Sequence, residues 1–157
     1  MDDRLGLGDY TTGLTDRLKP GDPAKVEGSF GHFTNQYIDK LDQIWIAGGI
    51  GVAPFLSMAN DITNEKVKLF YCVATPDQAN STDELEALAA KNPDFEFILW
   101  DSDSRGFLNA DGFDISDFSK YAYLMCGPAG LKQSLTRQLE EKGVSDKEIY
   151  EEEFGFR

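Results

Sequence analysis

The chain has 157 residues, of which 41% are hydrophobic, and this is enough apolar material for a sizeable globular core. Its formal net charge of −13 argues against nucleic acid and anionic membrane surfaces as partners. The same charge requires that any anionic cofactor be held by local donors. The two cysteines, Cys72 and Cys126, belong to no Cys-x-x-Cys motif or Cys/His cluster, so no metal site is expected. No run of about 18 apolar residues predicts a membrane span, and a reducing compartment such as the cytoplasm is expected.

The first part of the chain, residues 1–34, is crowded with glycine and differs in composition from the rest. Its pattern predicts a short helix over 12–18, a turn at 19–22 and a short strand over 24–28. One helix and one strand cannot make a core, so this segment is interpreted as the trailing edge of a β-domain. Residues 35–42 are then a connector to the next domain.

From residue 43 to residue 157, strands and helices are predicted to alternate. Strands that are covered on both faces are nearly continuously apolar. Right-handed crossovers between such strands favour a doubly wound parallel sheet. We therefore expect an α/β Rossmann-like fold with a sheet of about five strands. Ser81 and Glu84 have the spacing of a helix capping box. The polar stretch 101–105 is expected to be a loop, and the Gly/Asp-rich stretch after it is left unassigned. The predicted strands are 43–48, 67–73, 95–100, 121–126 and 148–154, and the helices are about 53–64, 82–91 and 129–142.

The first chemically informative stretch is the glycine-rich turn at the end of the first strand. It has the pattern Gly49-x-Gly51-x-x-Pro54, with Val52 and Ala53 filling the remaining positions before the helix. Such a turn exposes backbone N–H groups and the positive end of a helix dipole, which suits a phosphate. Dinucleotide binding and an ordinary strand-to-helix turn are evenly balanced interpretations of this stretch alone.

A second turn repeats this logic near the end of the chain. The buried strand that ends at Cys126 runs into Gly127, and Pro128 opens the next helix. Ligands of open α/β sheets lie beyond the carboxyl ends of the strands, so the two turns are expected to face one crevice.

Taken together, three segments in this order and separation resemble the nicotinamide-nucleotide domain of the ferredoxin–NADP reductase superfamily. They are residues 49–54, residues 126–128 and the terminal Glu152-Glu153-Phe154. The Glu-x-Phe ending is most similar to the ferric-reductase-like and flavohaemoglobin-reductase-like branches. The resemblance covers essentially the whole chain.

The resemblance implies roles for individual residues. Cys126 would lie beside the nicotinamide at the site of hydride transfer, where it positions the ring rather than attacking it. Phe154 would cover the flavin or nicotinamide with an aromatic face, and Glu152 would place a carboxylate near the flavin edge. The alternatives are a buried apolar cysteine, a core aromatic residue and a solvated strand face over 151–153. The implied contacts of the nicotinamide nucleotide, NADH or NADPH, are Gly49, Gly51, Val52, Ala53, Pro54, Thr75, Arg105, Gly127 and Pro128.

NADH is favoured over NADPH, because a 2′-phosphate needs cationic partners beyond the second and third strands. Thr75 and its neighbours after the second strand offer no cation. The loop 101–105 offers Arg105 among two aspartates, so Ser104-Arg105 remains an alternative phosphate site.

The resemblance also accounts for the N-terminal segment. Tyr10 and Thr11, in Gly-Asp-Tyr-Thr, are similar to the family's contact with the flavin pyrophosphate, and residues 19–31 resemble the end of its FAD-binding barrel. Ser29 stands where proline is usual, and the Arg-x-Tyr-Ser/Thr segment that grips the flavin is absent before Gly8. The chain is therefore expected to be a C-terminal piece of a longer flavoprotein reductase, and to be inactive alone.

The function implied is passage of a hydride from NAD(P)H to FAD and of single electrons to an acceptor. The acceptor would be haem, an iron–sulfur protein or ferric iron, reached in the cytoplasm or at the cytoplasmic face of a membrane reductase. No residue is a compelling general acid, base or nucleophile, and the cofactors carry this chemistry. Two other functions stay open: a non-catalytic nucleotide-sensing or protein-interaction module of the same fold, and a different Rossmann-like enzyme such as a transferase.

Overall fold

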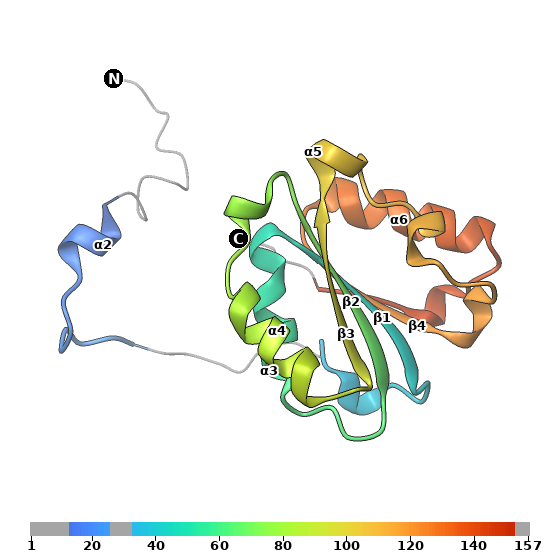
Figure 1. Cartoon of the computed structure of the whole chain (residues 1–157), viewed down its shortest axis with the longest axis horizontal. Coiled ribbons are helices and arrows are strands. Elements are labelled where there is room, and N and C mark those ends of the chain that lie inside the picture. The colour runs from blue at the N-terminus through green and yellow to red at the C-terminus, as the bar shows by residue number, and fades with distance from the viewer. Residues whose placement is uncertain (1–12, 26–32, 153–157) are drawn as a thin grey trace. The chain divides into compact units, whose positions relative to one another are not determined.

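The structure, a computed structural model, describes residues 13–25 and 33–152 (Figure 1). The chain divides into two compact units, Met1–Gly31 and His32–Arg157. The predicted sheet, its helices and both glycine turns all fall in the second unit.

The first unit contains one turn of helix, α2, over Leu14–Arg17. The helix predicted over 12–18 is therefore present and shorter. The predicted turn at 19–22 also forms, with the Asp22 amide donating to the Lys19 carbonyl at 3.0 Å. Of the strand expected over 24–28, the two residues that the structure describes are in no strand, and the rest lie outside the described residues.

The second unit is built on a five-stranded sheet in which every pairing is parallel, in the order β3-β2-β1-β4-β5. Because β1 pairs with β2 on one side and β4 on the other, the chain winds outward from β1 in both directions. This confirms the predicted doubly wound α/β fold. The strands are β1 Asp42–Gly48, β2 Lys66–Val73, β3 Phe95–Asp101, β4 Ala122–Cys126 and β5 Ile149–Glu151.

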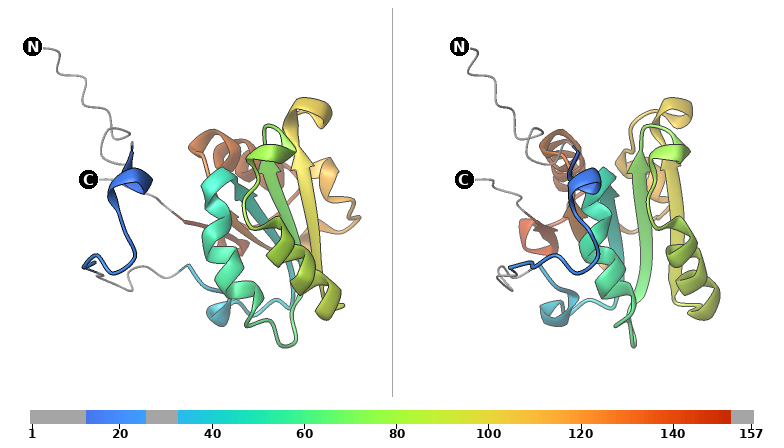
Figure 2. Two further views of the ribbon diagram at one scale, coloured as in Figure 1. Left: turned by 60° about the vertical axis from the view of Figure 1, so that its left-hand side comes forward. Right: turned by 90° about the vertical axis from the view of Figure 1, so that its left-hand side faces the viewer.

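Helices connect these strands, together with several short 3₁₀ turns (Figure 2). The helices of this unit are α3 Ala53–Ala59, α4 Thr82–Lys91, α5 Ser102–Arg105 and α6 Ala129–Glu141. The 3₁₀ turns are Asn35–Tyr37, Gly49–Val52, Pro76–Gln78, Ala110–Phe113, Phe118–Lys120 and Asp146–Glu148.

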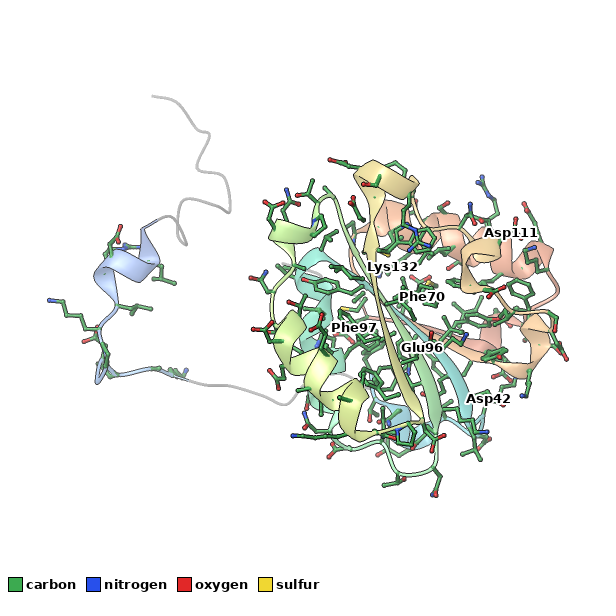
Figure 3. The ribbon with its side chains drawn as sticks, in the orientation of Figure 1. Asp42, Phe70, Glu96, Phe97, Asp111 and Lys132 are labelled. Atoms are coloured by element: carbon green, nitrogen blue, oxygen red, sulfur yellow. The ribbon has the colours of Figure 1, made fainter. Side chains whose placement is uncertain are left out.

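Two hydrophobic layers cover the two faces of the sheet (Figure 3). Residues of α3 and α4 pack on one face, where the Trp45 and Phe55 rings stack with centroids 5.4 Å apart. Residues of α6 and of the 110–113 turn pack on the other face, where Phe70 and Phe113 lie 5.2 Å apart. Strand β1 is therefore buried on both faces, as its continuous apolar sequence predicts.

Two local predictions are wrong. The helix expected over 53–64 ends at Ala59. The next two amides, of Asn60 and Asp61, donate to carbonyls three residues back, and further along the Glu65 carboxylate accepts the amides of Thr63 and Asn64. The capping box does not form either. Ser81 has a left-handed backbone with φ of 58° and its side chain makes no capping bond.

The polar stretch 101–105 also differs from the loop expected there. Asp101 caps one turn of helix, α5, by accepting the Ser104 hydroxyl and the Ser104 and Asp103 amides. These three bonds hold the pKa of the Asp101 carboxyl below its usual range.

We expect the buried amide of Gln43 to be essential to the stability of β1. Gln43 is fully buried, its Nε2 donates to the Lys40 carbonyl at 3.0 Å, and its Oε1 accepts the Trp45 indole N–H at 2.8 Å. Gln43→Leu leaves both partners unsatisfied, so the free energy of unfolding should fall by about 1–3 kcal/mol in denaturant titrations. The exposed Gln78→Leu is the matched control, and a similar loss there would contradict the assignment.

We also expect stability to fall at alkaline pH because of the two core thiols. Burial raises the pKa of Cys72 to about 12 and that of Cys126 to about 11. In the unfolded chain both ionise near their ordinary pKa of about 8.5. Above that pH the unfolded state binds fewer protons than the native state. The free energy of unfolding therefore falls as pH rises, by up to about 1.4 kcal/mol per pH unit for each thiol.

Urea titrations at about pH 8 and pH 9.5 measure this fall before tyrosines ionise appreciably. In a Cys72→Ala, Cys126→Ala double variant the pH dependence should be much shallower. An equally steep decline in that variant would show that other groups cause it.

Candidate functional site: a cleft at the strand ends

A cleft of about 600 Å³ opens at the carboxyl ends of β1 and β4. This is where the strand order reverses, the position at which open α/β sheets bind ligands. Both glycine turns contribute to it, together with the start of α6 and the end of β5. Its lining residues are Gly48, Gly49, Ile50, Gly51, Gly127, Pro128, Ala129, Lys132, Gln133 and Glu151.

The two turns pack against each other backbone to backbone. A Cβ on Gly51 would overlap the carbonyl oxygen of Cys126 and lie 2.6 Å from its carbonyl carbon. A Cβ on Gly48 would lie 2.6 Å from the Pro128 ring, and one on Gly127 would lie 2.9 Å from the Gly48 backbone. Side chains at these positions would therefore force the turns apart.

Gly49 differs from these close-packed glycines. Its φ is 54°, in the left-handed region that favours glycine, and a Cβ there would meet nothing within 4 Å. Next to it, the Ile50 side chain is 79% exposed at the cleft. The outer half of this turn thus faces open space, and a ligand can approach its backbone closely.

The rest of the first motif fixes the turn to the sheet. Val52 is buried in the layer beneath α3, whereas Ala53 is exposed and Pro54 half-buried in the first helical turn. Pro54 suits that position because its missing N–H has no helical partner there. These three residues support the turn and do not line the cleft.

Cys126 is the last residue of β4, and its side chain is fully buried in the layer that contains Trp45. Its backbone meets Gly51, but its thiol does not line the cleft. With a pKa that burial raises to about 11, the thiol is neutral at physiological pH, so it is not a nucleophile. The nearby Glu152 carboxylate also contributes to this raised pKa, so the structure places these two predicted residues near each other.

The end of β5 forms one wall of the cleft. The Glu152 amide donates to the Met125 carbonyl at 2.9 Å, which extends the pairing of β5 with β4. Phe154, the predicted aromatic cover, lies outside the described residues. So do Tyr10 and Thr11, the predicted flavin contacts.

Thr75 and Arg105 lie away from this cleft, at the carboxyl ends of β2 and β3. Thr75 precedes the 3₁₀ turn Pro76–Gln78. The Arg105 guanidinium stacks on the Trp100 ring, with Cζ 3.7 Å from the ring centroid. The two loops touch, because the Asp103 amide donates to the Ala74 carbonyl at 3.0 Å.

Three polar lining residues were missed from the sequence: Lys132, Gln133 and Glu151. A signal for Lys132 was present. The buried face of α6 consists of residues spaced at i, i+3 and i+7, which are Lys132, Leu135 and Leu139. A lysine on an apolar helix face requires a buried partner, and the structure supplies two oxygen atoms.

Within residues 13–25 and 33–152, no group of three metal-ligating side chains is found that could hold a metal ion. Among the same residues, none of the helices combines the length and apolar character needed to cross a membrane.

Comparison with known proteins gives a family match over most of this unit. Residues 45–137, more than half of the chain, match the family described as oxidoreductase NAD-binding domain. One component of the Na⁺-translocating NADH-quinone reductase of Marinomonas sp. is 31% identical, over 88% of this chain and 38% of that protein. The corresponding component from Methylococcus capsulatus is 29% identical with the same coverage. The chain thus spans well under half of the length of these curated relatives.

A solved structure carries the same fold. Ferredoxin-NADP⁺ reductase from Plasmodium falciparum, solved with 2′P-AMP, has a TM-score of 0.70 over 92% of this chain and 65% of its own, at 19% identity. This shared fold is consistent with the doubly wound parallel sheet described above. The chain therefore belongs to the oxidoreductase NAD-binding domain family, and it shares its fold with ferredoxin-NADP⁺ reductase.

Proposed function

We propose that this chain is the NADH-binding part of a flavoprotein reductase. The observation that carries the proposal is the pair of glycine turns, packed backbone to backbone, where the strand order of the sheet reverses. In the proposed reaction a hydride passes from the nicotinamide to FAD, and electrons leave singly to haem, an iron–sulfur protein or ferric iron. The reaction and its acceptor are proposed for the full-length protein.

The cleft has the features that a dinucleotide requires. The open side of the Gly49 turn lets a pyrophosphate approach the backbone, and the start of α6 presents the positive end of a 13-residue helix. Ile50 offers an exposed apolar contact beside it. We propose that backbone N–H groups of the two turns supply the hydrogen-bond donors for the pyrophosphate.

Cys126 is proposed to shape the nicotinamide end of the site and not to react. Its neutral, buried thiol fills the end of β4, and its carbonyl holds the Gly51 turn in place. The bound cofactors supply the redox chemistry, so the protein must orient the rings and exclude water. Phe154, Tyr10 and Thr11 keep their predicted roles as proposals.

The names of the curated relatives support NADH as the reductant and a Na⁺-translocating quinone reductase as one setting. We propose that this domain works in the cytoplasm, free or at the cytoplasmic face of a membrane reductase. The alternative, a nucleotide-sensing module, would bind NADH without reducing flavin in the full-length protein. Stopped-flow flavin absorbance separates the two functions.

We predict that Gly51→Ala weakens NADH binding. The added Cβ overlaps the Cys126 carbonyl and pushes the first turn off the second. The dissociation constant measured by calorimetry should rise at least about tenfold, equivalent to roughly 1.4 kcal/mol. Gly130→Ala is the matched control, because a Cβ there meets nothing within 4 Å and should leave binding intact. A folded Gly51→Ala variant with unchanged affinity would refute the proposed site.

We predict that NADH binds at least about tenfold more tightly than NADPH. Arg105 already stacks on Trp100, and the joined loops beneath it carry Asp77 and Asp103, which repel a 2′-phosphate. Asp103→Asn should therefore strengthen NADPH binding and leave NADH binding unchanged.

The control for this test is Asp83→Asn, in the first turn of α4, which changes the net charge equally. An unmodified chain that prefers NADPH would show that Arg105 outweighs the aspartates. Equal gains from both variants would assign the effect to overall charge.

A further inference from the structure

The cleft contains a buried lysine, Lys132, on the inner face of α6 (Figure 3). The residue is only 8% exposed. Its Nζ donates to the Glu152 carbonyl at 2.7 Å and lies 3.5 Å from the Glu151 carboxylate. A buried ammonium is costly unless oxygen atoms compensate it, and both compensating oxygens come from the end of β5.

Glu151 faces the same cleft and is held from two sides. Its second carboxylate oxygen accepts the Thr136 hydroxyl at 2.7 Å, one turn beyond Lys132 on α6. Among the lining residues, Lys132 and Glu151 are the two that carry charge. The side chains of the cleft wall are thus close to neutral in sum.

This neutrality matters because the whole chain carries a formal charge of −13. An uncompensated carboxylate in the wall would repel an anionic ligand, and salt would weaken this repulsion because the Glu151 side chain is 32% exposed. The backbone donors of the two turns would then have to overcome that repulsion.

We propose that Lys132 is a specificity-determining residue that cancels the Glu151 charge in the cleft wall. The cleft thereby accepts a ligand that carries a pyrophosphate. This inference rests on the proposed function and deepens it, because it names the group that makes the site permissive for an anion.

The charge role and the anchoring role predict different results. If Lys132 only anchors β5, its loss cannot be repaired by changing Glu151. If it neutralises Glu151, removing both charges restores an uncharged wall. Replacement of both members of an ion pair is often tolerated, whereas removal of Lys132 alone would leave the Glu151 charge uncompensated.

The test compares Lys132→Met, Lys132→Arg, Glu151→Gln and the double variant Lys132→Met, Glu151→Gln. NADH binding is measured by calorimetry at low and at high salt, and folding is checked by circular dichroism. Lys142→Met is the matched control. Lys142 lies at the end of the same helix, pairs with Asp111 at 2.7 Å and changes the net charge equally.

We expect Lys132→Met to weaken NADH binding at least about fivefold at low salt and less at high salt. The double variant and Lys132→Arg should bind within about twofold of the unmodified chain. Glu151→Gln alone should bind NADH more tightly, and Lys142→Met should change nothing.

Unchanged binding in Lys132→Met would overturn the inference. So would a double variant as weak as the single one, because Lys132 would then act only as an anchor. Failure of the unmodified chain to bind NADH would instead contradict the proposed function, and this inference with it.

Discussion

The site depends on one contact, the packing of two peptide backbones where β1 and β4 end. Gly48, Gly51 and Gly127 leave no room for a Cβ at this contact. Strands β1 and β4 pair in parallel, so the turns that follow them leave the sheet side by side. The turns can touch only where the residues at the contact have no side chain. The touching turns close one side of the cleft and direct their free surfaces outward. The same contact that completes the fold therefore creates the binding surface.

Strands β1, β2 and β4 could be predicted from the sequence because their residues are nearly continuously apolar, and the structure buries most of them. Strand β1 has four consecutive residues, Ile44 to Ala47, with no exposed surface, so no register gives it a polar face. The helix start after Gly51 and the stop at Gly143, where φ is 85°, follow from local glycine and proline chemistry. The local hydrogen bonds at the end of α3 and at the start of α4 could not be predicted in this way. After Ala59 the chain turns, and the Glu65 carboxylate accepts the Thr63 amide there, while the left-handed Ser81 does not cap α4.

In the candidate site, too, local sequence motifs predicted one part of the structure and could not predict the rest. The glycine motifs indicated the position of the cleft, but they did not indicate the reason for each glycine. Gly51 is required by the Cys126 carbonyl, whereas Gly49 is required by its own φ of 54° and faces open space. Lys132 and Glu151 stand 19 positions apart in the sequence, and only the parallel pairing of β5 with β4 brings them together. Such a pair is a property of topology, and local pattern cannot reveal it.

An acidic protein that binds an anion must keep its own charge away from the ligand. Two features of the cleft are proposed to do this: the open backbone of the Gly49 turn, and an ion pair in place of a lone carboxylate. Neither attracts an anion from a distance, so the site would gain little from electrostatic steering. Affinity then depends on short-range contact with the turns, and it is correspondingly sensitive to their spacing. That sensitivity is the physical reason why we expect a single methyl group at Gly51 to weaken binding more than a changed surface charge elsewhere on the chain.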